Sequence, residues 1–414
     1  RNKRGAMSSP VIDAAPTHAL LGGLQQQADT FVALRRDIHQ HPELGYAEFR
    51  SSDLVAERLQ AWGYEVTREL GGTGLVGQLK RGDGRKRLGL RADMDALPIH
   101  EATGLPWAST HAGRMHACGH DGHTAMLLAA AEHIARAGRF SGTLNLIFQP
   151  AEEGLGGAKA MMDDGLFERF PCDAVFAMHN MPGHRQGQLL LRDGATMASS
   201  DGLTITLTGK GSHGAMPHHS ADPVVAGSSI VLGLQSIVAR NVDPKAMAVI
   251  TVGAFQAGEA HNVIPGEAVL KLSVRALDRG VRATLRRRIE ELVDAQAKSF
   301  NVTWRMEQVT GYPVLVNTPA ETDFARAVAT ELVGAANVVP QTDPLSGSED
   351  FAFMLEQVPG SYLLIGNGDG SGDPHNGGHG ACMVHNPGYD FNDANLPIGA
   401  AYWALLTERF LAAD

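Results

Sequence analysis

Cysteine is scarce in this sequence, and its scarcity excludes one class of protein. Cys118, Cys172 and Cys382 are the only cysteines in 414 residues. Three cysteines cannot build the disulfide framework that stabilises many secreted domains, so a reducing compartment fits best. We therefore predict a cytoplasmic protein.

Long apolar runs and an excess of positive charge are also missing. No apolar run approaches the roughly twenty residues that span a bilayer, and 35 lysines and arginines stand against 45 aspartates and glutamates. The formal net charge of −10 argues against nucleic acid or an anionic membrane as the main partner. Arg1–Met7 is basic, but no apolar stretch follows it as in a secretory signal. It resembles an addition before a natural start, and the fold prediction excludes it.

The chain is long for a single core, so we expect two domains. Its first part alternates predicted helices and strands. The expected helices cover residues 25–40, 51–62 and 124–137, and the expected strands cover residues 74–79, 87–91, 144–148 and 174–178. This alternation is typical of an α/β layer with a mostly parallel sheet. Polar residues follow several of these strands, where open α/β sheets place their sites.

The pattern changes near Met197. Leu203, Ile205 and Leu207 alternate with threonines, which predicts a half-exposed strand. The next expected elements are a helix at 222–240, strands at 247–255 and 268–276, a helix with Leu285, Ile289, Leu292 and Val293 on one face, and a strand at 302–306. The order βαββαβ is that of the ferredoxin-like unit. We predict an α/β catalytic domain of residues 1–196 and 311–414, interrupted by an α+β domain of residues 197–310.

The segment Met115–His123 contains several potential metal ligands. It holds one cysteine, three histidines and one aspartate, and a buried helix follows that Asp121 or Thr124 could cap. Thiolate and imidazole ligands at short spacing suit zinc, cobalt or manganese. A polar loop with a buried free cysteine is the alternative interpretation of the same residues.

Further candidate ligands occur downstream. Glu152 and Glu153 follow one predicted strand, His179 ends the next, and His385 lies near the C-terminal end. Adjacent glutamates at a turn can point in different directions, so one can bind metal while the other acts as a base. A metal-assisted hydrolase needs this division, because a bound ion lowers the pKa of water from about 15.7 towards about 7.

Five segments, taken together, resemble a known family. They are Asp93–Pro98, His116–His123, Gln149–Gly154, Met178–Asn180 and His385–Pro387. Their order is similar to that in the dinuclear metallopeptidase-like amidohydrolases, which include hippurate hydrolases, bacterial N-acyl-amino-acid amidohydrolases and plant hydrolases of indoleacetyl-amino-acid conjugates. The similarity extends over almost the whole chain.

The resemblance implies a site with two divalent ions, zinc or manganese, with cobalt or nickel possible. The residues that match the family's ligands are Cys118, His120, Glu153, His179 and His385. It also implies that Glu152 is the general base. Asp95 matches a carboxylate that orients a ligand histidine, although a strand-end turn explains it equally well. His116 and His123 match no ligand, and we expect hydrogen-bonded structural roles for them.

The inserted domain resembles the family's lid, which also forms a homodimer or higher homo-oligomer. His213 matches a histidine that reaches the metal site, in several members from the partner subunit, and a surface histidine is the alternative. Asn262 and Arg275 match residues that grip a substrate carboxylate, a task that suits the arginine fork. A plain solvent-facing position remains open for Arg275.

We therefore predict an amidohydrolase that cleaves N-acyl-amino acids into a carboxylic acid and an amino acid through a metal-activated water. A dipeptidase or carboxypeptidase, or an N-acetyl-amino-acid deacetylase, would use the same site with a different pocket. A metal-binding scaffold without catalysis and an enzyme with Cys118 as its nucleophile are rivals of other classes. The intact Glu152 argues against the scaffold.

Overall fold

The computed structural model describes residues 18–368 and 382–412, so Arg1–Met7 lies outside the described residues. The described chain forms two compact units. The first contains the residues up to Gly194, Asn317–Asp343 and the residues from Phe353 onwards, and the second contains Ala195–Val316 and Pro344–Ala352. The domain boundaries given above remain a prediction.

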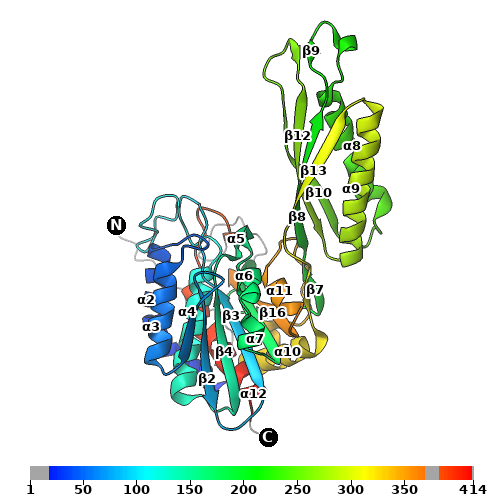
Figure 1. Cartoon of the computed structure of the whole chain (residues 1–414). Coiled ribbons are helices and arrows are strands. Elements are labelled where there is room, and N and C mark those ends of the chain that lie inside the picture. Colours follow the sequence, from blue (N-terminus) through cyan, green and yellow to red (C-terminus); the bar gives the residue numbers. More distant parts are fainter. Residues whose placement is uncertain (1–17, 369–381, 413–414) are drawn as a thin grey trace. The chain divides into compact units, whose positions relative to one another are not determined.

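A mainly parallel eight-stranded sheet runs through the first unit (Figure 1). The strands, in their order across the sheet, are β1 (Glu65–Leu70), β2 (Gly74–Arg81), β4 (Gly142–Gln149), β3 (Arg87–Asp93), β5 (Ala174–Arg185), β16 (Gly360–Gly368), β6 (Leu189–Leu190) and β15 (Val338–Val339). The central strands β4, β3, β5 and β16 pair in parallel. This arrangement confirms the predicted α/β class.

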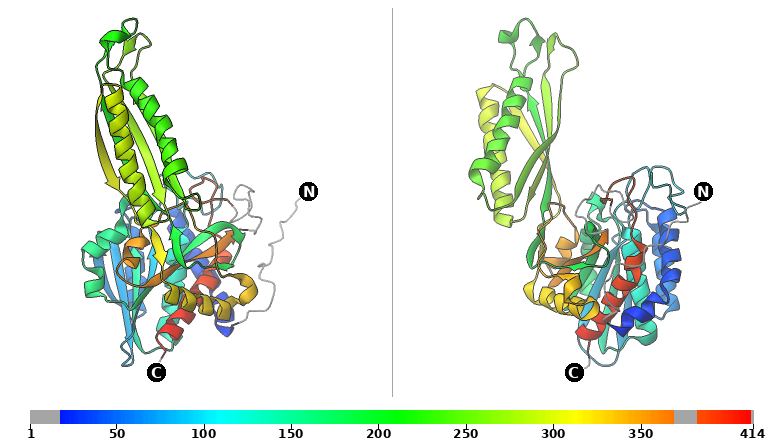
Figure 2. Two further views of the ribbon diagram at one scale, coloured as in Figure 1. Left: turned by 90° about the vertical axis from the view of Figure 1, so that its right-hand side faces the viewer. Right: turned by 180° about the vertical axis from the view of Figure 1, so that it is seen from behind.

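Helices cover both faces of this sheet. They are α1 (Ala19–Gln25), α2 (Ala28–Gln40), α3 (Phe49–Ala61), α4 (His120–Ala137), α5 (Glu152–Leu155), α6 (Gly157–Asp163), α7 (Leu166–Arg169), α10 (Pro319–Val333), α11 (Phe351–Leu355) and α12 (Leu396–Phe410). Short 3-10 turns occupy Ala335–Asn337 and Asp393–Asn395. Helices α2 and α12 lie over one face, and α6 and α7 lie over the other (Figures 1 and 2).

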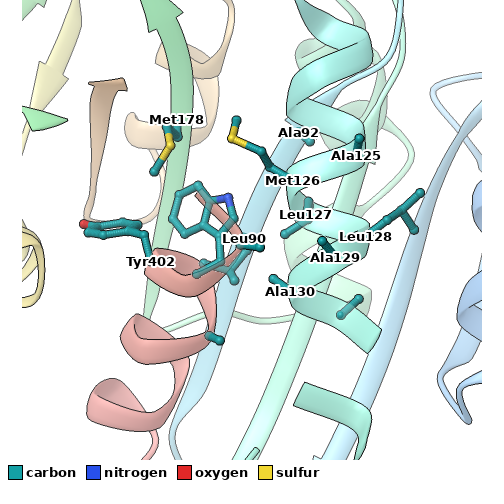
Figure 3. Close-up of a cluster of buried hydrophobic side chains, with 14 of the residues drawn as sticks. Leu90, Ala92, Ala125, Met126, Leu127, Leu128, Ala129, Ala130, Met178 and Tyr402 are labelled. Atoms are coloured by element: carbon teal, nitrogen blue, oxygen red, sulfur yellow. The ribbon is translucent and has the colours of Figure 1, made fainter. Parts of the chain in front are cut away.

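The largest core lies between the sheet and helices α4 and α12. Leu90 and Ala92 of β3, Met126 and Leu127 of α4, and Tyr402 of α12 are all buried there (Figure 3). Every residue of β3 from Leu88 to Asp93 is buried, because helices cover both faces of a central parallel strand. The core therefore fixes where the carboxyl ends of the central strands lie.

One feature of the sheet was not predicted, and another differs from the sequence prediction. Strands β2 and β3 follow each other through a turn, but they do not pair, because β4 lies between them. Strand β5 does not end at Met178 and continues to Arg185, because β16 pairs with it beyond the last residue that pairs with β3. His179 therefore lies inside a strand and not after one.

The second unit has the predicted ferredoxin-like order. Its four-stranded antiparallel sheet runs β10 (Ala248–Ala257), β12 (Glu267–Ala276), β8 (Ser199–Thr208) and β13 (Thr303–Thr310), and α8 (Pro223–Asn241) and α9 (Arg279–Ser299) cover one face (Figure 2). The remaining elements are β9 (Ser212–His213), the 3-10 turn Pro217–His219 and β11 (Val263–Ile264), with β7 (Gly194–Met197) and β14 (Leu315–Asn317), which pair with each other. Asp222 caps α8 by accepting from the Val224 N–H at 2.8 Å.

Helix α8 is long and apolar enough to cross a membrane by length and composition alone. It has 19 residues and a mean hydropathy of 1.3, which qualifies the expectation that no run approaches this length. In the structure, Ile230, Leu234 and Ile237 recur at helical spacing and are buried against the sheet. One face of α8 is therefore part of the core of the second unit.

A matched pair of leucines on α8 tests this packing. Leu234 is fully buried, whereas Leu232 is 75% exposed. We expect Leu234→Ala to lower the free energy of unfolding by about 2–5 kcal/mol, since it leaves a cavity. Leu232→Ala is expected to change it by less than about 0.5 kcal/mol. Urea denaturation followed by circular dichroism measures both, and equal effects would contradict the assigned face.

Candidate metal centre

The site begins where β3, β4 and β5 bring polar side chains to one edge of the sheet. Asp93 ends β3, Glu152 follows β4, and His179 lies on β5 beyond its pairing with β3. Parallel strands align their carboxyl ends, so residues distant in sequence meet there. Asp93 and Glu152 are buried together with His179, which makes any unpaired polar atom costly.

The segment before α4 turns sharply at Gly119. Its φ is 89°, and a Cβ at this position would collide with the side chains of Asn180 and Tyr389. Glycine is required for both reasons. The predicted cap is wrong: Gly119 is the N-cap without a side-chain bond, and the Thr124 hydroxyl donates to the Asp93 carbonyl. Helix α4 begins at His120, which places His120 in the first turn and not on the loop.

Asp95 positions two of the predicted ligands at once. Its Oδ1 accepts from Nδ1 of His120 at 3.1 Å, and its Oδ2 accepts from the backbone N–H of Glu153 at 2.9 Å. The His120 ring therefore presents Nε2 to the Glu153 carboxylate, with 4.0 Å between Nε2 and Oε1. A carboxylate that fixes the tautomer of a ligand histidine is a common feature of metal sites.

The other predicted ligands join the same cluster. His179 donates from Nδ1 to the Asn180 carbonyl at 2.6 Å, and its Nε2 lies 3.4 Å from Sγ of Cys118. Nε2 of His385 lies 3.2 Å from Oε1 of Glu153. The backbone N–H of His385 donates to the Ala117 carbonyl at 2.7 Å, so the two ligand-bearing segments are hydrogen-bonded to each other.

The residues of this cluster fit a metal ion. Nε2 of His120 and Oε1 of Glu153 are buried and make no hydrogen bond within the part of the chain that the structure describes. With Sγ of Cys118, these ligand atoms all lie within 4.8 Å of one another. Buried lone pairs that face each other are unfavourable unless a cation lies between them. Sulfur, imidazole and carboxylate ligands together suit zinc and related ions.

Neighbouring carboxylates shift the pKa values of two predicted ligands. Burial alone would lower the pKa of His120, but Asp93 and Asp95 raise it to about 10. Burial and the neighbouring glutamates raise the pKa of the Cys118 thiol well above its usual value. Both shifts favour a positive charge at this place, whether a proton or a metal ion. A raised thiol pKa is the opposite of what a cysteine nucleophile needs.

In a second group of potential ligands, His123 already makes hydrogen bonds within the protein through both ring nitrogens. His123 and Asp93 lie close to His120 and His179, and their atoms also meet the distance criterion for a metal site. However, His123 donates from Nδ1 to Asp93 at 2.7 Å and accepts at Nε2 from the Asn180 N–H at 3.0 Å. Both ring nitrogens of His123 are thus used within the protein, as expected for a structural histidine.

His116 has a different environment. Neither ring nitrogen has a hydrogen-bond partner among the described residues, and the side chain is buried. Burial lowers the pKa of His116 to about 4, so the ring is neutral at physiological pH. The expected hydrogen bonds of this histidine are absent from the described part of the structure.

Buried carboxylates also hold the turn that carries Glu152. Ala151 adopts the left-handed conformation with φ of 51°, and its N–H donates to Oε1 of Glu48 at 2.8 Å. Glu152, which is 7% exposed, and Glu153 then begin the short element α5, in which the backbone of Glu153 is not helical. The chain bends here because Glu48 and Asp95 each accept one backbone N–H of this short segment.

His213, Asn262 and Arg275 all belong to the second unit. His213 is on β9, which pairs with β11, and the Gly214 N–H donates to the Asn262 carbonyl at 2.7 Å. The structure thus brings His213 and Asn262 together. Arg275 lies on β12 and donates to the Ser346 carbonyl at 3.1 Å, so it is separate from that ribbon.

Sequence reasoning missed two residues of the first unit. Asn180 bridges three segments: its Nδ2 donates to the Cys118 carbonyl at 2.7 Å, and its Oδ1 accepts from the Tyr389 hydroxyl at 2.7 Å. Arg35 is fully buried near Asp121. A signal for Arg35 exists, because it lies on the apolar stripe of its helix beside Leu34, where a charge is unexpected.

Comparisons with known proteins agree with this geometry. Residues 89–409 match the family described as peptidase family M20/M25/M40. A hippurate hydrolase of Campylobacter jejuni is 45% identical over 381 residues, which cover 92% of this chain and 96% of the relative. An IAA-amino acid hydrolase of Arabidopsis thaliana, ILR1-like 4, is 36% identical over 388 residues, which cover 92% of this chain and 86% of the relative.

A solved structure shares the fold. The crystal structure of a Bacillus subtilis dinuclear metal-binding peptidase of the M20 family superposes with a TM-score of 0.79 at 29% identity. The match covers 94% of this chain and 100% of the other. The family resemblance of the five sequence segments is confirmed.

Proton release on metal binding tests the cluster. Cys118 and His120 have raised pKa values, so both hold protons that a divalent ion must displace. We expect the apparent affinity for zinc to fall as the pH is lowered, by roughly tenfold per unit for each displaced proton. Calorimetry in buffers of different ionisation enthalpy counts the protons.

Cys118→Ser is expected to weaken binding and to reduce the number of protons released, because a predicted thiolate ligand is lost. Cys172→Ser is the matched control, since the Cys172 thiol bonds instead to the Phe170 carbonyl and Asn145. An affinity for zinc that does not change with pH would contradict the role of these two groups.

Proposed function

The chain belongs to peptidase family M20/M25/M40, and from this premise we propose that it hydrolyses N-acyl-amino acids of the hippurate type. The products are a carboxylic acid and an amino acid. Metal-dependent hydrolysis of amide bonds is the activity that the family and the named hydrolase relatives share with this chain. The high identity to a hippurate hydrolase is the observation that supports the narrower substrate class.

Two divalent ions would be held by the five predicted ligands, Cys118, His120, Glu153, His179 and His385. We propose zinc or manganese, with cobalt or nickel as possible substitutes, because the donors combine one sulfur with imidazole and carboxylate. When bound, the ions polarise the amide carbonyl and lower the pKa of water. Asp95 orients His120 and the Glu153 backbone for this task.

Glu152 is the proposed general base. It would accept a proton from the water whose oxygen forms a bond to the carbonyl carbon of the amide. The carbon–nitrogen bond then breaks, and Glu152 passes the proton to the leaving amine nitrogen. Its burial supports this role, because a partly desolvated carboxylate is a stronger base than one in bulk water.

His213 is the proposed donor to the carbonyl oxygen as negative charge develops there. Its Nδ1 accepts from the Ala215 N–H at 3.0 Å, so the proton of the neutral ring is on Nε2, and the ring can donate. Asn262 and Arg275 are proposed to bind the substrate carboxylate, for which the arginine fork is suited. These roles require the second unit of this chain, or of a partner, to meet the metal centre.

Two related activities would use the same catalytic residues. A dipeptidase or carboxypeptidase, and an N-acetyl-amino-acid deacetylase, differ from the proposed enzyme in the pocket around the amide and not in the chemistry. A substrate panel therefore decides among them without affecting the proposed mechanism.

We further propose a homodimer or higher homo-oligomer formed through the second unit. Strands β10 and β13 are the edges of its sheet, and each carries an exposed apolar side chain, Phe255 and Val309 respectively. Sedimentation of the purified protein tests this. A cytoplasmic location also remains a proposal, supported by three free cysteines.

Chelation and a Glu152 variant test the mechanism together. We expect hydrolysis of hippurate to disappear when the metal is chelated and to return with zinc, manganese or cobalt. Glu152→Gln is expected to lower kcat by roughly 10²–10⁴ while metal binding is retained, because the amide cannot accept the proton. Glu168→Gln, at an exposed position of α7, is the control.

Activity that survives complete metal removal would overturn the metal-dependent mechanism. Cleavage of dipeptides without cleavage of hippurate or other acyl-amino acids would keep the mechanism and replace the substrate class.

The role of His213 is tested by His213→Ala. If its N–H stabilises charge that develops only in the transition state, kcat is expected to fall by roughly 10²–10³ with little change in KM. His218→Ala removes another exposed histidine of the second unit and is expected to leave both constants unchanged. A rise in KM alone would assign His213 to ground-state binding.

A further inference from the structure

A cluster of buried charged side chains lies next to the candidate metal centre, and Arg35 is at its middle. Arg35 is on α2 and is fully buried. Its Nε lies 2.8 Å from Oδ2 of Asp121, its Nη1 lies 3.4 Å from Oδ1 of Asp393, and it donates from Nη2 to Asp390. One guanidinium group therefore contacts three carboxylates from two distant parts of the chain.

His39 extends the cluster by one turn of the same helix. Its Nδ1 lies 2.8 Å from the Asp121 oxygen that Arg35 also contacts, and its Nε2 lies 3.3 Å from Oε1 of Glu101. Glu101 in turn accepts from the backbone N–H of Ser109 at 2.7 Å. The cluster thus fixes the long segment between β3 and α4 as well as the start of α4.

The carboxylates of the cluster are neighbours of proposed metal ligands. Asp121 directly follows His120 in the first turn of α4, and Asp390 follows His385 by five residues. Between them, Tyr389 donates to Asn180, which in turn donates to the Cys118 carbonyl. Arg35 is therefore connected to both ligand-bearing segments, although it contacts no ligand itself.

Burial of so many charges needs a reason other than stability. Removing ions from water costs free energy that the ion pairs regain only when their geometry is good, and well-packed apolar residues often replace such pairs without loss. The core of this unit contains many apolar residues at equivalent depth. A cluster of buried charges at this place, one residue from a proposed ligand, points to a demand for exact orientation.

We propose that Arg35 is a positioning residue of the metal centre. Its planar fork sets the distance between the segment of Cys118 and His120 and the segment of His385, through Asp121 and Asp390. This inference deepens the proposed function and rests on the metal centre described there. Lysine cannot replace the fork, because an ammonium group is a single point of charge without fixed donor directions.

The test is metal binding by Arg35→Lys, which keeps the charge and removes the fork. We expect its dissociation constants for zinc and cobalt to rise by roughly 10–100-fold, as for other residues that orient ligands. The visible absorption spectrum of the cobalt-loaded protein is expected to change, because its bands depend on ligand geometry. At limiting metal, hydrolysis should fall, and excess metal should restore part of it.

Arg282→Lys is the matched control. Arg282 also donates two hydrogen bonds to one carboxylate: its Nε and its Nη2 each lie 2.7 Å from an oxygen of Asp201. Arg282 belongs to the second unit. We expect this variant to lose stability without any change in metal affinity or cobalt spectrum. A general loss of stability would affect both variants alike, whereas the proposed role affects only Arg35→Lys.

Asp390→Asn decides the question if Arg35→Lys does not fold. It keeps the size of the side chain, removes one charge from the cluster, and is expected to weaken metal binding in the same direction. Unchanged metal affinity and an unchanged cobalt spectrum in a folded variant would overturn the inference. Failure of the wild-type protein to bind two ions would instead overturn the proposed metal centre.

Discussion

Buried carboxylates at the carboxyl ends of the parallel strands are the constraint on which this structure depends. Asp93 and Asp95 are almost completely inaccessible to water, and each must therefore be satisfied inside the protein. Asp93 is paired with Arg91 and His123, and Asp95 accepts from His120 and the Glu153 backbone. The orientation of His120 and the position of the Glu153 backbone follow from how Asp95 is satisfied.

The same principle holds the irregular segments in place. Short loops that carry functional residues cannot satisfy their backbone through regular helices or strands. Here side-chain carboxylates replace those bonds: Glu48 accepts from Ala151 in front of Glu152, and the Arg35 cluster holds the start of α4. A few buried polar contacts thus hold the site in a fixed position relative to the rigid helices and strands. Such contacts are strong in the low-dielectric interior when every polar group is paired.

Local sequence patterns were sufficient to predict most of the helices and strands. Helix α8 has its cap, its first-turn proline and its apolar stripe within one stretch of sequence, so its bounds could be predicted closely. Strand β12 alternates buried with more exposed residues along its length, and the order of the elements matches the βαββαβ prediction. The pairing of β4 between β2 and β3 could not be predicted, because strand order depends on contacts between distant segments. The same holds for the extension of β5 beyond Met178, which pairing with β16 creates.

The sequence by itself determined the types of residue at the site and the family to which the chain belongs. Cysteine, histidine and paired glutamates after predicted strands indicate metal-assisted hydrolysis, because ligand chemistry is a property of side chains. Only the tertiary structure decided which of these side chains are already satisfied. His123 is excluded as a ligand by its bonds to Asp93 and Asn180, and Arg35 meets Asp390 across 355 positions of the chain. Such pairings depend on the packing of whole layers, and no local spacing records them.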